Sequence, residues 1–315
     1  MARTKGEPEG RYTLTEDRRD RAVGALLGLA VGDAIGTTLE FKRRDAQPPV
    51  TDMIGGGPFG LRPGQWTDDT AMALCLADSI LASGGLDQHD LMARFVRWWR
   101  HGENSCTGAC FDIGITTSDA LARFEQTGDP VAGSTHPRSA GNGSLMRLAP
   151  VAIRWHADPT GAQSAAREQS VTTHGAPAAV EACALYAQML VEAIQGQPKE
   201  PVLVSRHWPD DSDVGRVASG SWRGRQRPDV SSSGYVIHTL EAALWAVDQA
   251  AGFREAVLIA ANLADDADTV AAVAGQLAGG LWGASGIPVE WRTRVAWSGR
   301  IGDVAAALYE AGTAA

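Results

Sequence analysis

Two stretches of the sequence place carboxylate and hydroxyl side chains directly before long apolar runs. They are Thr67, Asp68 and Asp69 before residues 71–81, and Asp265, Asp266, Asp268 and Thr269 before residues 270–282. One acid at the start of a helix is ordinary capping, because it satisfies free N–H groups and suits the helix dipole. Crowded acids repel one another unless a cation lies among them. The pattern therefore favours a shared metal site over capping alone.

The chemistry of these side chains indicates which metal they would bind. Carboxylates and threonine hydroxyls are hard oxygen donors, which suit Mg²⁺, Mn²⁺ or Ca²⁺, whereas zinc prefers His and Cys. Two acidic groups can hold two ions that share bridging carboxylates. Sites of that kind clamp substrate oxygens and orient a water molecule.

A third acidic segment, residues 32–41, lies at the end of an apolar helical pattern. Asp33 is on the apolar face of that pattern, so it must be paired or hydrogen-bonded if it is buried. Glu40 follows between Leu39 and Phe41, and its ordinary interpretation is a loop acid.

Helical spacing positions these residues and predicts an all-α fold of many helices. The predicted helices include residues 69–81, 91–100, 176–194, 235–250, 254–263, 269–282 and 303–311. The best strand-like run, 202–204, is too short to found a sheet. Gly24, Gly28, Gly32 and Gly36 recur at every fourth position, at a cost to the helix of roughly 1 kcal/mol each. Such a stripe indicates a second helix packed backbone to backbone against the first.

The domain organisation is simple. We expect a flexible N-terminal segment, residues 1–14, and one compact domain, residues 15–315. The longest polar stretch, 195–234, contains four prolines and several arginines. Because helical spacing resumes directly after it, we interpret it as an excursion from a single domain.

Composition limits the classes of partner and the compartment. The 315 residues carry a net charge of −9, which disfavours general binding to nucleic acid or to an anionic membrane. The most apolar early run, 22–32, is about half of the ~20 residues that cross a bilayer, and no secretory signal pattern precedes it. The four cysteines form no disulfide framework. We expect a cytoplasmic protein without a membrane span.

Four blocks together resemble the ADP-ribosylglycohydrolase family. They are GALLGLAVGDAIGTTLEF (24–41), GQWTDDTAMAL (64–74), AGNGSLMRLAPV (140–151) and DDADTVAAVAGQLAGGLWG (265–283). Two further blocks, at 107–121 and 219–247, are similar to the branch that contains dinitrogenase reductase-activating glycohydrolase, which removes ADP-ribose from arginine side chains. The resemblance covers residues 20–312 approximately. It implies an all-α fold with a central cleft and a dinuclear Mg²⁺ or Mn²⁺ centre.

The resemblance also implies roles for individual residues. The implied metal ligands are Thr67, Asp68, Asp69, Asp266, Asp268 and Thr269. Asp265 is then an extra acid outside the ligand set. Glu40 matches a glutamate beside the metals, and Asp112 matches an acid proposed to transfer a proton; the sequence leaves open which of the two is the base.

Further matches concern the ligand cleft. A diphosphate would be bound by Gly141, Asn142, Gly143 and Ser144, because small residues let backbone N–H groups approach anionic oxygens. Without the resemblance, the same four residues would be interpreted as a turn. His174 and Tyr235 match positions that line the cleft. Without the resemblance they would be a histidine at a helix start and a core aromatic.

The implied reaction is metal-dependent hydrolysis of the N-glycosidic bond in ADP-ribosylated arginine on a target protein, with ADP-ribose as the product. Two alternatives share the same fold. One is hydrolysis of another ADP-ribosyl linkage, to serine, to a nucleic acid base or in a free ADP-ribose derivative. The other is a toxin-neutralising immunity protein that acts partly by occlusion.

Overall fold

The computed structural model describes residues 9–209 and 212–313, and within them all regular secondary structure is helical. The α-helices are α1 (Glu9–Gly36), α2 (Asp68–Ser83), α3 (Gln88–His101), α4 (Ile115–Thr127), α5 (Ala149–Arg154), α6 (Pro159–Val171), α7 (Pro177–Ile194), α8 (Lys199–Leu203), α9 (Asp213–Ala218), α10 (Val236–Gln249), α11 (Phe253–Ala261), α12 (Ala267–Trp282), α13 (Val289–Arg294) and α14 (Ser298–Thr313). The 3-10 helices are η1 (Thr37–Leu39), η2 (Pro137–Ser139), η3 (Arg227–Asp229) and η4 (Ala284–Gly286). The predicted all-α class is confirmed.

The helices predicted from spacing correspond to α2, α3, α7, α10, α11, α12 and α14. The strand-like run 202–204 does not form a strand, since its first two residues end α8. Of the predicted flexible N-terminal segment, residues 1–8 lie outside the described residues, and residues 9–14 begin α1.

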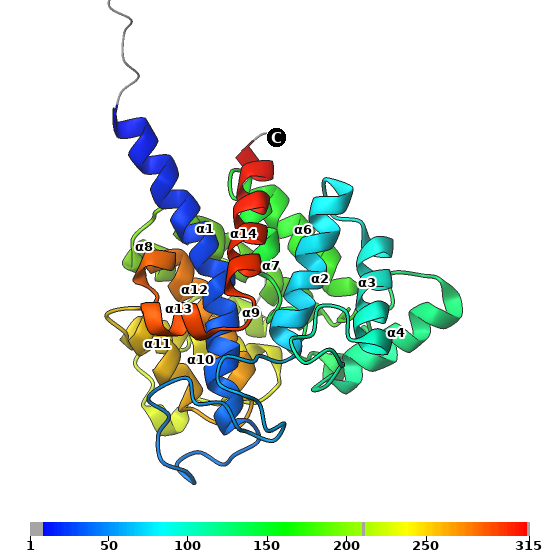
Figure 1. The fold of residues 1–315 in the computed structure, drawn as a ribbon, viewed down its shortest axis with the longest axis horizontal. Helices are drawn as coiled ribbons and strands as arrows, with labels where there is room; N and C mark the ends of the chain where they lie inside the picture. The colour runs from blue at the N-terminus through cyan, green and yellow to red at the C-terminus, as the bar shows by residue number, and fades with distance from the viewer. Residues whose placement is uncertain (1–8, 210–211, 314–315) are drawn as a thin grey trace, which may run out of the picture.

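Helices α1 and α12 lie side by side and antiparallel in the middle of the molecule, although most of the chain separates them (Figure 1). The glycine stripe of α1 forms the contact. A Cβ on Gly28 would lie 2.2 Å from the carbonyl oxygen of Gly275, and one on Gly32 would lie 2.1 Å from that of Ala271. The predicted backbone-to-backbone neighbour is therefore α12. This pairing brings the C-terminal end of α1 to the N-terminal end of α12.

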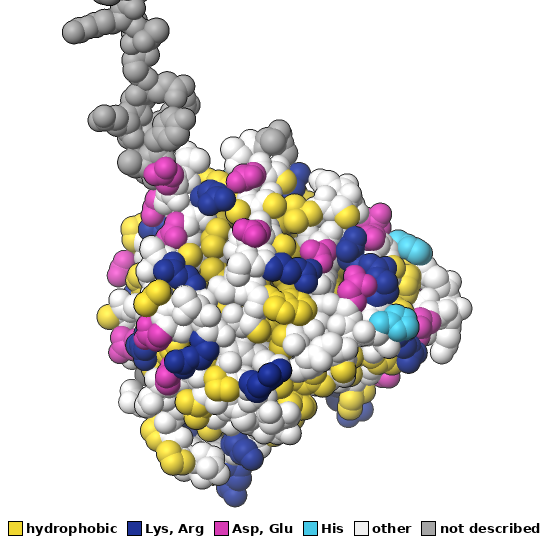
Figure 2. Space-filling model, in the orientation of Figure 1, with side chains coloured by type: hydrophobic (Ala, Val, Ile, Leu, Met, Phe, Trp, Pro, Cys, Tyr) yellow, Lys and Arg dark blue, Asp and Glu magenta, His cyan; other side chains and the backbone are white. Residues whose placement is uncertain are grey.

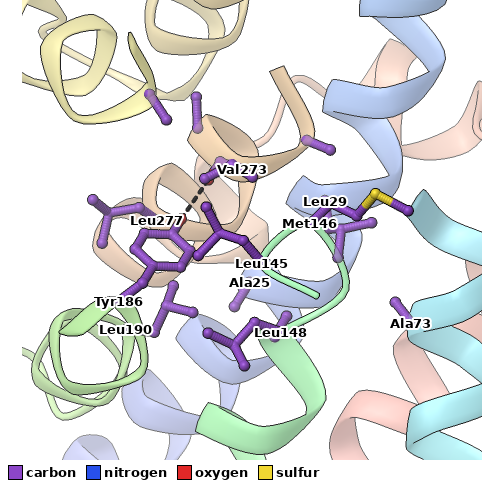
Figure 3. Packing of buried hydrophobic residues seen from close by; sticks show 14 of the residues in the cluster. Ala25, Leu29, Ala73, Leu145, Met146, Leu148, Tyr186, Leu190, Val273 and Leu277 are labelled. Atoms are coloured by element: carbon purple, nitrogen blue, oxygen red, sulfur yellow. Dashed lines mark hydrogen bonds between the residues drawn. The ribbon is translucent and has the colours of Figure 1, made fainter. Parts of the chain in front are cut away.

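A shared core surrounds this helix pair. Figure 3 shows Tyr186 of α7 reaching α12, where its hydroxyl donates a hydrogen bond to the carbonyl oxygen of Val273. Leu145 and Leu148, from the segment before α5, pack into the same space and are fully buried. The core therefore anchors the segment that follows the glycine-rich residues 141–143.

Two segments meet the length and composition of a membrane span, Thr15–Leu39 and Pro177–Ile194. In the fold, 89% and 67% of their most apolar windows are buried inside the protein. Both thus serve as core helices here. On the face shown in Figure 2, acidic and basic side chains are interspersed over the surface.

The polar excursion 195–234 contains the short elements α8, α9 and η3. Ion pairs join some of its arginines to the rest of the chain. Arg206 pairs with Glu192 at 2.8 Å, and Arg227 pairs with Asp45 at 2.7 Å. These side chains fasten the excursion to the domain.

Candidate active site

The end of α1 organises the start of α2 through Asp33. This fully buried carboxylate accepts hydrogen bonds from the backbone N–H and hydroxyl of Thr67, at 2.8 and 2.9 Å, and from those of Thr70, at 3.1 and 2.6 Å. Asp33 thereby caps α2 from another helix, which satisfies N–H groups that its own residues leave free. The expectation that a buried Asp33 must be hydrogen-bonded is confirmed.

Glu40 organises the start of α12 in the same way. Its Oε2 accepts hydrogen bonds from the backbone N–H groups of Ala267, at 2.7 Å, and Asp268, at 3.3 Å. The flanking backbone is joined as well, since Phe41 N–H donates to the carbonyl oxygen of Asp265 at 2.7 Å. Glu40 is buried, so it is no ordinary loop acid.

These contacts bring the two acidic stretches together. Thr67 Oγ1 lies 3.4 Å from Asp268 Oδ2, although the residues are 201 positions apart. Carboxylate oxygens within 4.8 Å of one another form two groups that could hold a metal ion, and the groups are Asp33, Asp69 and Asp268, and Glu40, Asp266 and Asp268. Asp268 belongs to both. The sequence assigned no ligand role to Asp33, and only its position on an apolar face marked it.

Three of the predicted ligands lie outside the closest carboxylate groups. Asp68 borders the pocket described below, Thr67 is hydrogen-bonded to Asp33, and Thr269 lines the pocket at the first turn of α12. The neighbouring Asp265 is exposed and has a positive φ of 65°. Asp265 also borders the pocket, but its exposure distinguishes it from the buried acids.

The buried carboxylates repel one another, and a bound cation would offset that repulsion. Burial, followed by the charge of Asp268, raises the pKa of Asp33 and of Asp266 to about 7. Burial also raises the pKa of Asp68, Asp69 and Glu40 well above their usual range. Oδ1 of Asp69 is buried without a hydrogen-bond partner. Several carboxylate oxygens, one of which lacks a hydrogen-bond partner, are suitable ligands for a divalent ion such as Mg²⁺ or Mn²⁺.

These pKa shifts predict how Mg²⁺ stabilises the protein at different pH. Because the folded metal-free protein holds protons on Asp33 and Asp266 that the unfolded chain loses at about pH 4, its stability falls as the pH rises through about 7. A bound cation removes that repulsion. Excess Mg²⁺ should therefore raise Tm by at least about 3 °C more at about pH 8 than at about pH 5.5. Thermal melting in EDTA and in MgCl₂ measures this difference, and equal increments at both pH values would contradict it.

The acids form one wall of a pocket of about 500 Å³. Its other walls come from the segment before α4, from the glycine-rich loop and from the turn before α7. The lining residues include Glu40, Asp68, Asp112, Gly141, Asn142, Gly143, His174, Asp266, Asp268 and Thr269. No Lys or Arg is among the described residues that line it. A ligand that fills the pocket thus meets acids on one side and small polar groups on the other.

Asp112 faces the acids from the loop between α3 and α4. Burial, then the charge and a hydrogen bond of Asp268, raises the pKa of Asp112 to about 9. Its backbone has a positive φ of 59°, a conformation that non-glycine residues seldom adopt. The structure therefore holds a second carboxyl group besides Glu40 where a proton could be exchanged with a ligand.

The glycine-rich loop 141–144 is fixed by the two segments that flank the pocket. Asn142 Nδ2 donates to Asp266 Oδ2 at 2.5 Å and to Thr239 Oγ1 at 2.8 Å, and its backbone N–H donates to the carbonyl oxygen of Gly234 at 3.1 Å. The backbone N–H groups of Gly143 and Ser144 donate to no acceptor among the described residues. An anionic oxygen is the partner that such free N–H groups bind well.

The remaining predicted cleft residues divide into two kinds. His174 lines the pocket. Ser144 is fully buried behind the loop, where its hydroxyl lies 2.8 Å from that of Ser170. Tyr235 lies with its backbone beside Gly141, while its hydroxyl donates to Asp213 at 2.7 Å. Ser144 and Tyr235 are thus placed to support the loop, and neither side chain is part of the pocket lining.

Comparison with known proteins agrees with this arrangement. The family model for ADP-ribosylglycohydrolase matches residues 14–315. ADP-ribosylarginine hydrolase Tri1 of Pseudomonas putida (strain GB-1) is 50% identical over 95% of this chain and 80% of its own length. ADP-ribosyl-[dinitrogen reductase] glycohydrolase of Rhodospirillum rubrum is 32% identical over 88% of this chain and 90% of its own.

A solved structure gives the same result for the fold. The structure described as an ADP-ribosylglycohydrolase-related protein complex has a TM-score of 0.85 and 41% identity, and the match covers 94% of this chain and 99% of that one. The family model spans nearly the whole chain, including every residue of the pocket. The chain belongs to the ADP-ribosylglycohydrolase family of enzymes.

Proposed function

We propose that this enzyme hydrolyses the N-glycosidic bond between ADP-ribose and an arginine side chain of a modified protein. The observation that carries the proposal is a group of carboxylates and the free N–H group of Gly143 that line one pocket. The two relatives named for ADP-ribosylarginine and for ADP-ribosylated dinitrogen reductase support the choice of substrate.

The acids would hold two divalent cations, Mg²⁺ or Mn²⁺. The predicted ligands Thr67, Asp68, Asp69, Asp266, Asp268 and Thr269 would bind them, and Asp33 joins this set through its proximity to Asp69 and Asp268. Bound ions would neutralise the carboxylates and supply Lewis acidity toward oxygen ligands.

The chain's own residues do the rest. The free N–H group of Gly143, which lines the pocket, binds the diphosphate, and this places the ribose beside the acids. Water adds to the anomeric carbon as the bond to the guanidine nitrogen breaks, through an oxocarbenium-like state. Glu40 and Asp112 are the two carboxyl groups placed to take a proton from the water and return one to the leaving guanidine. Two backbone N–H groups fix Glu40 Oε2, whereas Asp112 stands on the opposite loop.

We also propose a cytoplasmic setting for the enzyme. Cys75, Cys106, Cys110 and Cys183 are all free thiols, which suits a reducing cytoplasm. There the substrate would be an ADP-ribosylated protein, and the products would be free ADP-ribose and the restored arginine.

A linkage assay tests the function. We expect ADP-ribose release from a protein modified on arginine, at a rate at least about 100-fold above that from a serine-linked protein, because the two leaving groups differ in the atom that departs. EDTA should abolish release, and Mn²⁺ or Mg²⁺ should restore it. The Asp68→Ala variant is the control for contaminating hydrolase. Equal release from both linkages would contradict the proposed specificity.

A further inference from the structure

One buried cation lies directly behind the pocket. Arg147 is fully buried, and its guanidinium forms no ion pair with a carboxylate of the described residues. It is held instead by neutral acceptors, since Nε donates to the side chain of Gln169 at 2.9 Å and Nη2 donates to the carbonyl oxygen of Gln169 at 3.0 Å and to Thr173 Oγ1 at 2.9 Å. A buried charge with that arrangement orients its acceptors strongly.

Thr173 links this cation to a residue of the pocket. Its hydroxyl lies 2.8 Å from Nδ1 of His174, and both side chains are buried. Because the Thr173 oxygen accepts a hydrogen bond from Arg147, its proton is left to point to Nδ1. The alternative, in which Nδ1–H donates to Thr173, would leave a buried hydroxyl proton without an acceptor. A neutral imidazole that accepts at Nδ1 carries its proton on Nε2.

The Nε2 edge of the ring faces the glycine-rich loop. A Cβ built on Gly143 would lie 3.1 Å from Nε2 and 2.7 Å from Cε1, and one built on Gly141 would lie 3.3 Å from Nε2. The two glycines therefore make room for this ring as well as for a ligand. Burial and the charge of Arg147 lower the pKa of His174 to about 3, so the ring is neutral at physiological pH.

We propose that Thr173, oriented by Arg147, is a positioning residue that holds His174 as its Nε2–H tautomer, so that the ring donates a hydrogen bond to the diphosphate bound at residues 141–143. This inference rests on the proposed function for the identity of the ligand. The chain of hydrogen bonds from Arg147 to Nδ1 is a property of the ligand-free protein and can be tested separately.

The tautomer is measured by two-bond ¹H–¹⁵N NMR correlations of the imidazoles in ligand-free protein, with His174 assigned by its loss in His174→Gln. The wild-type ring should show the Nε2–H pattern. In Thr173→Val, which keeps the shape and removes the hydroxyl, the two tautomers should mix. The Kd for ADP-ribose, measured by calorimetry, should weaken about tenfold. On ADP-ribosylarginine, KM should rise by a similar factor while kcat changes less than about twofold.

Two further variants make the test specific. Thr173→Ser should restore both the tautomer and the Kd. Thr172→Val is the matched control, because Thr172 lies 3.4 Å from the same nitrogen of Arg147 and its hydroxyl donates to the carbonyl oxygen of Gln169, away from His174; it should leave both unchanged. An Nδ1–H pattern in the wild type, or unaltered ADP-ribose binding in Thr173→Val, would overturn the proposal. If the wild type binds ADP-ribose yet cleaves no linkage, the proposed hydrolysis fails while the positioning role is upheld.

Discussion

Replacement of Asp268 by Asn should lower ADP-ribose release by at least about 1,000-fold. Asp268 is the one carboxylate shared by both groups that could hold an ion, so its loss weakens both at once. The fold should persist, because an Asn oxygen can still accept the hydrogen bond that Thr269 N–H donates to Asp268 Oδ1 at 2.8 Å. Without metal the variant should be at least as stable as the wild type, since one repelling charge is gone.

Asp265→Asn is the matched control for this variant. It makes the same chemical change three positions away, at an exposed acid that borders the pocket, and it should keep activity within about threefold of wild type. Release of ADP-ribose and binding of Mn²⁺ are measured for both variants. Normal turnover and Mn²⁺ binding in Asp268→Asn would refute the ligand assignment.

Replacement of Gly28 by Ala should destabilise the protein by about 3 kcal/mol, although Ala favours helix more than Gly does. The added Cβ would meet the backbone of Gly275 at 2.2 Å, and a backbone on either side cannot yield as a flexible side chain can. Because α1 and α12 together position the acids Asp33 and Asp268, their separation should also lower activity. Urea unfolding followed by circular dichroism gives the free energy of unfolding.

We expect the opposite effect on the free energy of unfolding for Gly299→Ala. Gly299 lies in α14 with no atom near its would-be Cβ, so helix propensity alone acts, and stability should stay equal or rise by up to about 1 kcal/mol. A Gly28→Ala protein as stable as Gly299→Ala would show that the two helices are not in backbone contact.

Much of this structure could be predicted from local patterns. Periods of three and four residues gave the long helices, since each buries one apolar face. The stripe from Gly24 to Gly36 predicted a close helical neighbour. The glycine stripe could not identify α12 as that neighbour. The matching small residues Ala271 and Gly275 lie in a largely apolar helix, where they form no distinct pattern.

The site was less accessible to sequence reasoning. The crowded acids within 67–69 and 265–269 indicated a metal centre, because acids so close in sequence repel one another whatever the rest of the fold is. The position of Asp33 among them depends on tertiary packing, since its partner Asp268 is brought near only by the α1–α12 contact. The local sequence also could not show that Ser144 is buried outside the pocket, whereas its neighbour Gly143 lines the pocket. That depends on Ser170 behind the loop.

The pairing of α1 with α12 has a consequence for synthesis of the chain on the ribosome. Helix α1 emerges first, yet its glycine groove has no partner until residues 267–282 have been translated. Until then, the side of α1 that carries the glycines lacks the helix that covers it in the folded protein. Contacts between such distant residues also slow folding. A nascent chain can therefore complete its active site only after residues 267–282 have been made.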